Sequence, residues 1–149
     1  MKQKYVKFLV IFLLVFLAGC GQNSDHVLIN NGIKDIIINV QIADDNEERV
    51  QGLMFIEKLD ENEGMLFIFE KEDYQAFWMK NTLIPLDIIF INDELQIVDI
   101  KNAVPCKQDP CDIYTSKQPA KYVLELNKGF AMKNSINEGD KITITMKNQ

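Results

Sequence analysis

Apolar and polar side chains alternate with a period of two along much of the chain after residue 36. The alternation is clearest at 39–42, 120–126 and 142–146. Successive side chains of a β-strand point to opposite faces of the sheet, so this pattern indicates strands with one buried face. Strands are predicted at residues 39–42, 64–69, 75–79, 87–91, 95–101, 120–126 and 142–146. The sequence therefore predicts a mainly β fold, a compact single domain resembling an antiparallel β-sandwich or barrel.

Two segments depart from this alternation and predict one or two short helices. In residues 44–54 the acidic side chains come first and the apolar side chains recur at helical spacing. Residues 128–137 form the second helical candidate, which ends near Gly139. Between the strands predicted at 87–91 and 95–101, Asn92-Asp93 predicts a β-hairpin with a two-residue turn.

The first nineteen residues predict a bacterial lipoprotein signal peptide. Three lysines at positions 2, 4 and 7 precede the apolar stretch Phe8–Ala18, which is shorter than the roughly 20 residues of a membrane-spanning helix. The stretch ends in Leu17-Ala18-Gly19-Cys20, where small residues precede a cysteine. This arrangement is typical of a lipoprotein processing site, and an ordinary secretory leader with an incidental cysteine is the alternative.

Cys20 is therefore the predicted lipidation site and the first residue of the mature protein. Two or more acyl chains would hold the protein on the extracytoplasmic side of a membrane, either periplasmic or at the cell surface. Residues 20–35 are rich in Asn, Gly and Ser and are predicted to form a lipidated tether with a short strand at 27–29. Residues 36–149 form the predicted domain, and the membrane is the predicted partner of the anchor.

The charge of the mature chain excludes one class of function. Removing the three leader lysines from the 16 basic residues leaves 13 against 22 acidic residues, a net charge of −9. An acidic surface repels phosphate backbones, so no nucleic-acid partner is predicted. The predicted partners are an unidentified small ligand or another protein of the cell envelope.

Cys106 and Cys111 are the only cysteines besides Cys20. An even pair in an oxidising compartment predicts a disulfide that shapes a short loop. The alternatives are a thiol pair for redox exchange or for metal binding. The C-x4-C spacing differs from the C-x-x-C of thioredoxin-like sites, and no histidine lies nearby to complete a zinc site. No metal and no cofactor are therefore predicted.

Arg49 and the segment Phe77–Thr82 are the strongest candidates for a binding site. Arg49 is the only arginine, and its planar set of donors suits a carboxylate, either on a ligand or within the protein. Strand alternation places Phe77 and Met79 on one face and Trp78 and Lys80 on the other. A tryptophan beside a lysine and an amide suits a shallow sugar or carboxylate site, whereas a buried Trp78 above a simple turn is the structural alternative.

Other chemistry has less support. Three methionines suit Cu(I), although methionines more often fill cores, and they are Met54, Met65 and Met79. No catalytic histidine candidate, G-x-S-x-G or H-E-x-x-H motif is present, so no catalytic residue is assigned. Four acidic residues could supply a catalytic carboxylate pair, and they are Glu63, Asp87, Asp99 and Glu125.

Six phrases, in this order along the chain, are together similar to the family called domain of unknown function 192. They are Arg49–Phe55, Glu63–Phe67, Phe77–Thr82, Pro85–Phe90, Cys106–Cys111 and Tyr122–Leu126. The resemblance runs from about Ile36 to the C-terminus and implies a compact, mainly β domain that is often exported. It implies no reaction. Its motif residues mark the candidate ligand-binding positions, which are Arg49, Trp78, Lys80, Asn81 and Asp87.

The leading hypothesis is a lipid-anchored envelope protein that binds a ligand or partner without catalysis. The first alternative is an envelope enzyme acting on cell-wall or sugar substrates through two carboxylates, which would face each other across about 5–10 Å. The second is Cu(I) handling, which requires the sulfur atoms of the three methionines to converge.

The anchor leads to a first prediction. Metabolic labelling with a palmitate analogue is expected to tag the protein, and the mapped N-terminus of the mature chain is expected to be Cys20. An unlabelled product, or an N-terminus at another residue, would contradict the lipoprotein interpretation.

Overall fold

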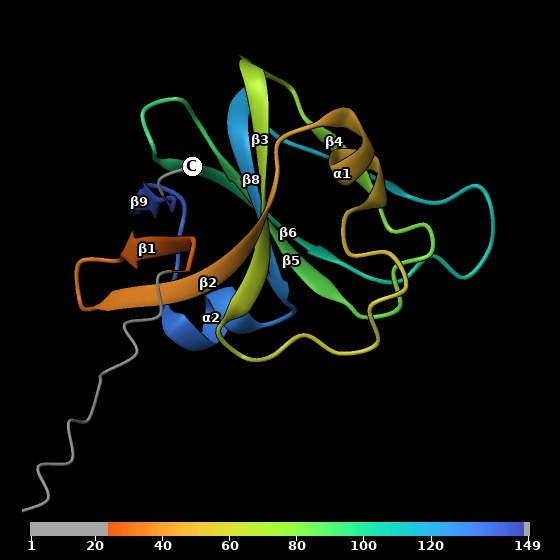
Figure 1. Ribbon diagram of the computed structural model, residues 1–149, viewed down its shortest axis with the longest axis horizontal. Helices are drawn as coiled ribbons and strands as arrows, with labels where there is room; N and C mark the ends of the chain where they lie inside the picture. The colour runs from red at the N-terminus through yellow and green to blue at the C-terminus, as the bar shows by residue number, and fades with distance from the viewer. Residues whose placement is uncertain (1–23, 148–149) are drawn as a thin grey trace, which may run out of the picture.

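The structure, a computed structural model, describes residues 24–147, and its main element is a seven-stranded sheet curled into a half-barrel (Figure 1). In spatial order the strands are β6 (Ile97–Ala103), β5 (Leu86–Ile91), β8 (Ala120–Asn127), β3 (Glu63–Asp73), β2 (Asp35–Ala43), β1 (His26–Asn30) and β9 (Lys141–Thr145). The predicted mainly β class is confirmed. Every neighbouring pair is antiparallel except β2 and β3, which run parallel.

The parallel pair depends on the long connection between β2 and β3. A parallel pair cannot be joined by a tight turn, and residues 44–62 supply the crossover, which includes α1 (Asn46–Gln51). Asp45 and Glu48 form a capping box, in which the Asp45 carboxylate accepts the Glu48 backbone N–H at 2.8 Å. The helix ends at Gly52, whose φ of +46° is unfavourable for residues with a side chain. These two caps make α1 shorter than the helix predicted at 44–54.

The two edges of the curled sheet meet at one end. Gln96, just before β6, forms an isolated antiparallel bridge with Lys141 of β9. The Ile97 N–H donates to the carbonyl of Asp140 at 2.9 Å, and the Ile142 N–H donates to the carbonyl of Leu95 at 2.9 Å. These bonds close the half-barrel locally, so part of each edge strand is paired.

The sheet carries an apolar core on each face. The inner core draws residues from all seven strands and from α2 (Phe130–Asn134), and its largest fully buried members are Ile29, Ile38, Leu66, Ile89, Ile91, Ile97 and Leu124. The outer core lies on β3, β5, β6 and β8, and its largest fully buried members are Phe67, Met79, Leu86, Ile88 and Phe90. All six residues of β5 are buried. Burial on both faces explains why residues 88–91 of this strand form a continuous apolar run instead of an alternation.

A separate two-stranded ribbon, β4 (Ala76–Trp78) and β7 (Ile113–Thr115), adds to the outer core. Phe77 of β4 is its anchor, with ring centroids 5.0 Å from Phe67 and 6.0 Å from Phe90 in edge-to-face geometry. Trp78 points the other way and is 46% exposed. The strand predicted at 75–79 therefore exists, but it lies outside the main sheet.

The hairpin predicted between β5 and β6 is present, although the predicted two-residue turn is wrong. The register ends at Ile91 opposite Ile97, so residues 92–96 form the turn. The Asn92 N–H donates to the carbonyl of Gln96 at 3.0 Å, and the Leu95 N–H donates to the carbonyl of Asn92 at 3.1 Å. Leu95 has a φ of +59° and begins no strand.

The folded domain begins earlier than its predicted boundary at Ile36. The short strand predicted at 27–29 is present as β1, which pairs with both β2 and β9. Val27 and Ile29 are completely buried in the inner core. The predicted signal peptide and Cys20 lie outside the described residues. Among residues 24–147, no helix is long and apolar enough to cross a membrane.

Asp87, a candidate ligand-binding residue, is a structural side chain. It is fully buried at the start of β5, and its Oδ1 accepts hydrogen bonds from Asn102 Nδ2 at 2.6 Å and from the Gly129 N–H at 3.0 Å. Its Oδ2 accepts the Ala131 N–H at 2.9 Å. Gly129 has no side chain to cap α2, so Asp87 satisfies the first donors of that helix from another strand.

Asp87→Asn is expected to destabilise the domain by about 2 kcal/mol, because it replaces a buried charged acceptor by an amide that cannot accept all three bonds. Urea unfolding measures the change. Asp112→Asn, at an exposed aspartate, is the control and is expected to leave the unfolding midpoint unchanged. Equal midpoints for the two variants would contradict the capping role.

Candidate functional site

Two hollows lie beside the β4–β7 ribbon and are the candidate sites. The first, the aromatic hollow, measures about 430 Å³ and is lined by Asn46, Arg49, Val50, Phe67, Phe69, Gln75, Ala76, Phe77 and Trp78. The second, the disulfide cleft, measures about 690 Å³ and is lined by Met79, Pro85, residues 104–108, residues 110–112, Tyr114 and Lys128. Both volumes fall in the range of roughly 300–1,000 Å³ that small-ligand sites occupy.

Arg49 reaches the aromatic hollow from α1 and also ties the helix to the sheet. Its Nη1 donates to the carbonyls of Asp44 and of Ile68, the second at 2.8 Å. Its Nη2 donates to Asn46 Oδ1 at 2.7 Å. The guanidinium also lies 5.4 Å from the centroid of the Phe69 ring. Arg49 therefore serves the fold through backbone carbonyls, and only part of its donor capacity remains for a ligand.

Trp78 and Phe77 illustrate how strand alternation builds the aromatic hollow. Phe77 is half-buried, and its ring lies 6.4 Å from that of Phe69 in edge-to-face geometry. Met79 is buried in the outer core, as the alternation predicts. Trp78 is 46% exposed, and Lys80 Nζ lies 5.6 Å from the centroid of its ring. The hollow thus combines aromatic surfaces with a polar rim.

The rim carries two neutral amides that sequence reasoning missed. Asn46 Oδ1 is occupied by Arg49, which orients the Asn46 side chain at the edge of the hollow. Gln75 Nε2 donates to the carbonyl of Ala120 at 3.1 Å, which fixes this amide in place. Neither residue stands out in the sequence, because an Asn in a first helical turn and a Gln before a strand are ordinary. Their role appears only once α1 and β4 are adjacent to the same hollow.

The five candidate ligand-binding residues do not share one pocket. Arg49 and Trp78 line the aromatic hollow, whereas Lys80 and Asn81 line neither hollow and Asp87 caps α2. Lys80 Nζ pairs with Asp109 Oδ2 at 3.3 Å. Asn81 has a φ of +58°, and its carbonyl accepts the Phe55 N–H at 2.9 Å. Asn81 is therefore a turn residue, which is one of the two interpretations of its motif.

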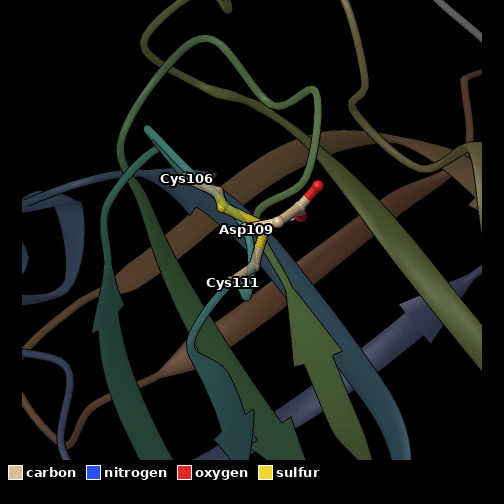
Figure 2. Close-up of side chains that lie close together, drawn as sticks. All are labelled: Cys106, Asp109 and Cys111. Atoms are coloured by element: carbon tan, nitrogen blue, oxygen red, sulfur yellow. Dashed lines mark hydrogen bonds between the residues drawn. A yellow bond between two sulfur atoms is a disulfide. The ribbon is translucent and has the colours of Figure 1, made fainter.

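A disulfide joins Cys106 and Cys111 and forms one wall of the disulfide cleft. Figure 2 shows the bonded sulfur atoms with Asp109 beside them. Asp109 Oδ1 lies 3.6 Å from Cys111 Sγ, and Cys106, Asp109 and Cys111 form the only cluster of metal-ligand type within residues 24–147. Because the two sulfur atoms are bonded to each other, the disulfide closes the loop covalently at the wall of the cleft.

The carboxylates proposed for catalysis occupy separate environments, and none of them lines either hollow. Burial alone would raise the pKa of Asp99. The carboxylate accepts hydrogen bonds from Lys101 Nζ and from the Lys117 N–H, both at 2.9 Å, and lies beside two lysine charges. These contacts outweigh the effect of burial, so the pKa of Asp99 lies below its usual value. Glu63 is exposed at the start of β3.

The three methionines considered for Cu(I) also lie in different surroundings. Met65 and Met79 are packed in the outer core, and Met54 Sδ lies 3.8 Å from Asn81 Nδ2.

The family described as "Uncharacterized ACR", domain of unknown function 192, matches residues 27–144. The chain belongs to this family. The matched segment covers the strands from β1 to β9, so the family corresponds to the whole curled sheet.

Relatives of this DUF192 chain come from archaea and bacteria. The UPF0127 protein of Pyrococcus furiosus is 28% identical over 114 residues, which cover 73% of this chain and 89% of that protein. The UPF0127 protein of Thermococcus gammatolerans is 29% identical over 107 residues, which cover 70% of this chain and 65% of that protein.

Two crystal structures have a similar fold. A Sinorhizobium meliloti protein described as a candidate transcription regulator has a TM-score of 0.75 and 34% identity, covering 80% of this chain and 92% of that one. A Novosphingobium aromaticivorans protein of unknown function has a TM-score of 0.74 and 34% identity, covering 79% of this chain and 83% of that one.

Glu125 is a buried acidic residue of this DUF192 domain whose pKa is strongly raised. It lies in the middle of β8, opposite Met65 of β3 and Ile88 of β5, and is 4% exposed. Its neighbours in sequence, Leu124 and Leu126, belong to the inner core, so alternation places Glu125 on the outer face. Burial raises the pKa of Glu125 from 4.5 to about 8, because the ionised form loses its hydration.

This raised pKa predicts a specific pH dependence of stability. The unfolded chain releases the Glu125 proton near pH 4.5 and the folded chain near pH 8, so the folded state binds more protons between these values. The free energy of unfolding is therefore expected to fall as pH rises through this window and to level off above it, a loss on the order of 5 kcal/mol.

Glu125→Gln is expected to remove most of this slope and to make the domain more stable than the parent at pH 8. Chemical unfolding at pH 5, 6.5 and 8 measures the effect. Glu63→Gln, at an exposed glutamate, is the matched control and should retain the slope of the parent. A parent protein whose stability is unchanged across the window would contradict the buried, neutral state of Glu125.

Proposed function

We propose that this chain is a lipid-anchored extracytoplasmic protein whose DUF192 domain binds an acidic sugar in the aromatic hollow without catalysing a reaction. The observation that carries the proposal is that α1 and β4 bring Arg49 and Trp78 to the same hollow. These two residues are separated in the sequence and were each a candidate on chemical grounds. The anchor rests on the sequence motif at Cys20.

The aromatic surfaces of the hollow suit the apolar face of a sugar ring. Trp78 is 46% exposed, and the rings of Phe69 and Phe77 continue the wall from the half-buried side. Flat aromatic faces orient ligands that have one apolar face and a polar edge. The amides of Asn46 and Gln75 supply donors and acceptors where the hydroxyl groups of such a ring would lie.

Arg49 supports an acidic sugar over a neutral one. An arginine has five N–H donors, and three contacts hold Arg49 to Asp44, Ile68 and Asn46. The remaining donors have no partner among residues 24–147 and suit a carboxylate on the ligand. A guanidinium that is already held by the protein loses little rotamer freedom when a ligand binds.

The environment of the acidic residues supports binding without catalysis. Glycoside hydrolysis through carboxylates needs two such groups beside the sugar. No aspartate or glutamate lines the aromatic hollow. Asp87 and Asp99 are already committed to α2 and to two lysines.

The Sinorhizobium relative is described as a candidate transcription regulator, but the charge of this chain does not favour binding to DNA. The mature chain carries a net charge of −9, which disfavours contact with a nucleic-acid backbone. A leader that directs export would also separate the domain from chromosomal DNA.

Trp78 provides the test, because it is the only tryptophan of the chain and lies in the hollow. Its fluorescence is expected to change on titration with hexuronic acids or N-acetylmuramic acid, and to change less with the corresponding neutral hexoses. Trp78→Ala, followed by calorimetry, is expected to weaken binding about tenfold or more, because the stacking surface is lost.

Tyr74→Ala is the matched control, since Tyr74 is an aromatic side chain that is 59% exposed and lies outside the hollow. This variant should bind like the parent. The sugar proposal fails if neither the fluorescence nor the heat signal responds to any acidic sugar. It also fails if Trp78→Ala binds as tightly as the parent.

A further inference from the structure

Much of the wall of the disulfide cleft is apolar. Its apolar lining consists of Met79, Pro85, Val104, Pro105, Pro110, Tyr114 and the disulfide itself. Val104 is 47% exposed although it is a large aliphatic residue. Apolar surface that remains open in a cleft of about 690 Å³ favours a ligand with an apolar body.

Two lysines of the cleft have no ion-pair partner. Lys107 and Lys128 line the cleft, and neither forms a salt bridge or a side-chain hydrogen bond within residues 24–147. By contrast, six other lysines of the described chain pair with carboxylates. Asp112 is the only acidic residue that lines the cleft. In a strongly acidic domain, this local excess of positive charge favours an anion.

The walls of the cleft are held in place before any ligand binds. The Cys106 N–H donates to the carbonyl of Met79 at 3.3 Å, and the Val104 N–H donates to Tyr114 Oη at 3.2 Å. Pro85 and Lys128, which also line the cleft, are joined by a hydrogen bond from the Lys128 N–H to the carbonyl of Pro85 at 3.1 Å. The disulfide and the first two bonds fix the loop, and the third fixes another part of the lining. A site that is already ordered loses less conformational entropy when it binds.

We propose that the disulfide cleft is a second binding site, which takes an anionic amphiphile: an alkyl or acyl body against the apolar wall and a carboxylate or phosphate head between Lys107 and Lys128. The ligand class follows from the lining: the apolar wall suits the alkyl or acyl body, and the two lysines suit the anionic head. This site does not include Arg49 or Trp78, so it stands independently of the sugar proposal.

The test uses nuclear magnetic resonance titration of the isotope-labelled soluble domain with probes below their micelle concentrations. The probes are octanoate, octyl phosphate, 1-octanol, acetate and inorganic phosphate. Octanoate, octyl phosphate or both are expected to shift the amide signals of Met79, Tyr114 and the non-proline residues of 104–112. The tighter of the two identifies the head group. Acetate, phosphate and 1-octanol are expected to bind at least about tenfold more weakly. Acetate and phosphate lack the alkyl body, and 1-octanol lacks the anionic head.

A pair of double variants separates the site from a general charge effect. Lys107→Gln with Lys128→Gln is expected to weaken binding of the octyl anion about tenfold, because both head-group cations are lost. Lys71→Gln with Lys141→Gln makes the same change in net charge at two exposed lysines outside the cleft and should bind like the parent.

Three results would overturn the proposal. The first is equal affinity for 1-octanol and octanoate, which would show that the lysines do not recognise the head. The second is equal affinity for inorganic phosphate and octyl phosphate, which would show that the apolar wall is not used. The third is an octyl anion that shifts signals outside the cleft or binds both double variants equally. None of these results depends on whether the aromatic hollow binds a sugar.

Discussion

The fold depends on burying both faces of three adjacent strands, β5, β8 and β3. A sheet that is apolar on both sides must be covered twice. Here the curl of the sheet and α2 cover one face, while the loop after α1 and the β4–β7 ribbon cover the other (Figure 1). Phe77 makes the second cover specific, because its ring packs edge-to-face against Phe67, Phe69 and Phe90. Because Phe77 points into the core, the opposite side of β4 must face solvent. This alternation explains why Trp78 is exposed.

The two hollows are consequences of how this outer cover is assembled. A three-residue ribbon is too narrow to cover the outer core completely, so gaps remain between it and its neighbours. On the β4 side the gap is bounded by α1 and becomes the aromatic hollow. On the β7 side it is bounded by the disulfide loop and becomes the disulfide cleft. Lys80 lines neither of them, but its Nζ lies over the ring of Trp78 and pairs with Asp109, so it connects a residue of the aromatic hollow to the disulfide loop.

Particular elements show what sequence reasoning reached and where it stopped. Most of the strands, the two helical segments and the opposite orientations of Phe77 and Trp78 were predicted, because each depends on local periodicity, whereas the three-residue strand β7 was not predicted. The turn after β5 was misjudged, since Asn92-Asp93 is compatible with a tight turn and only the pairing of Ile91 with Ile97 shows that the loop is longer. Asp87 was expected near a ligand, although it caps α2 from a distant strand. A buried carboxylate looks the same in sequence whether it binds a ligand or a helix end.

By itself, the sequence determined the charge of the chain, the strand periodicity and the motifs of the family, because all of these are properties of local composition and order. It also predicts a lipoprotein signal that ends at Cys20. Only the tertiary structure decided that β2 and β3 run parallel, that β1 belongs to the sheet, and that Arg49 and Trp78 line one hollow while Lys80 and Asp87 do not. The physical reason is that these relations are contacts between segments far apart in the chain. Such contacts are selected by which faces must be buried together, and no local pattern records that choice.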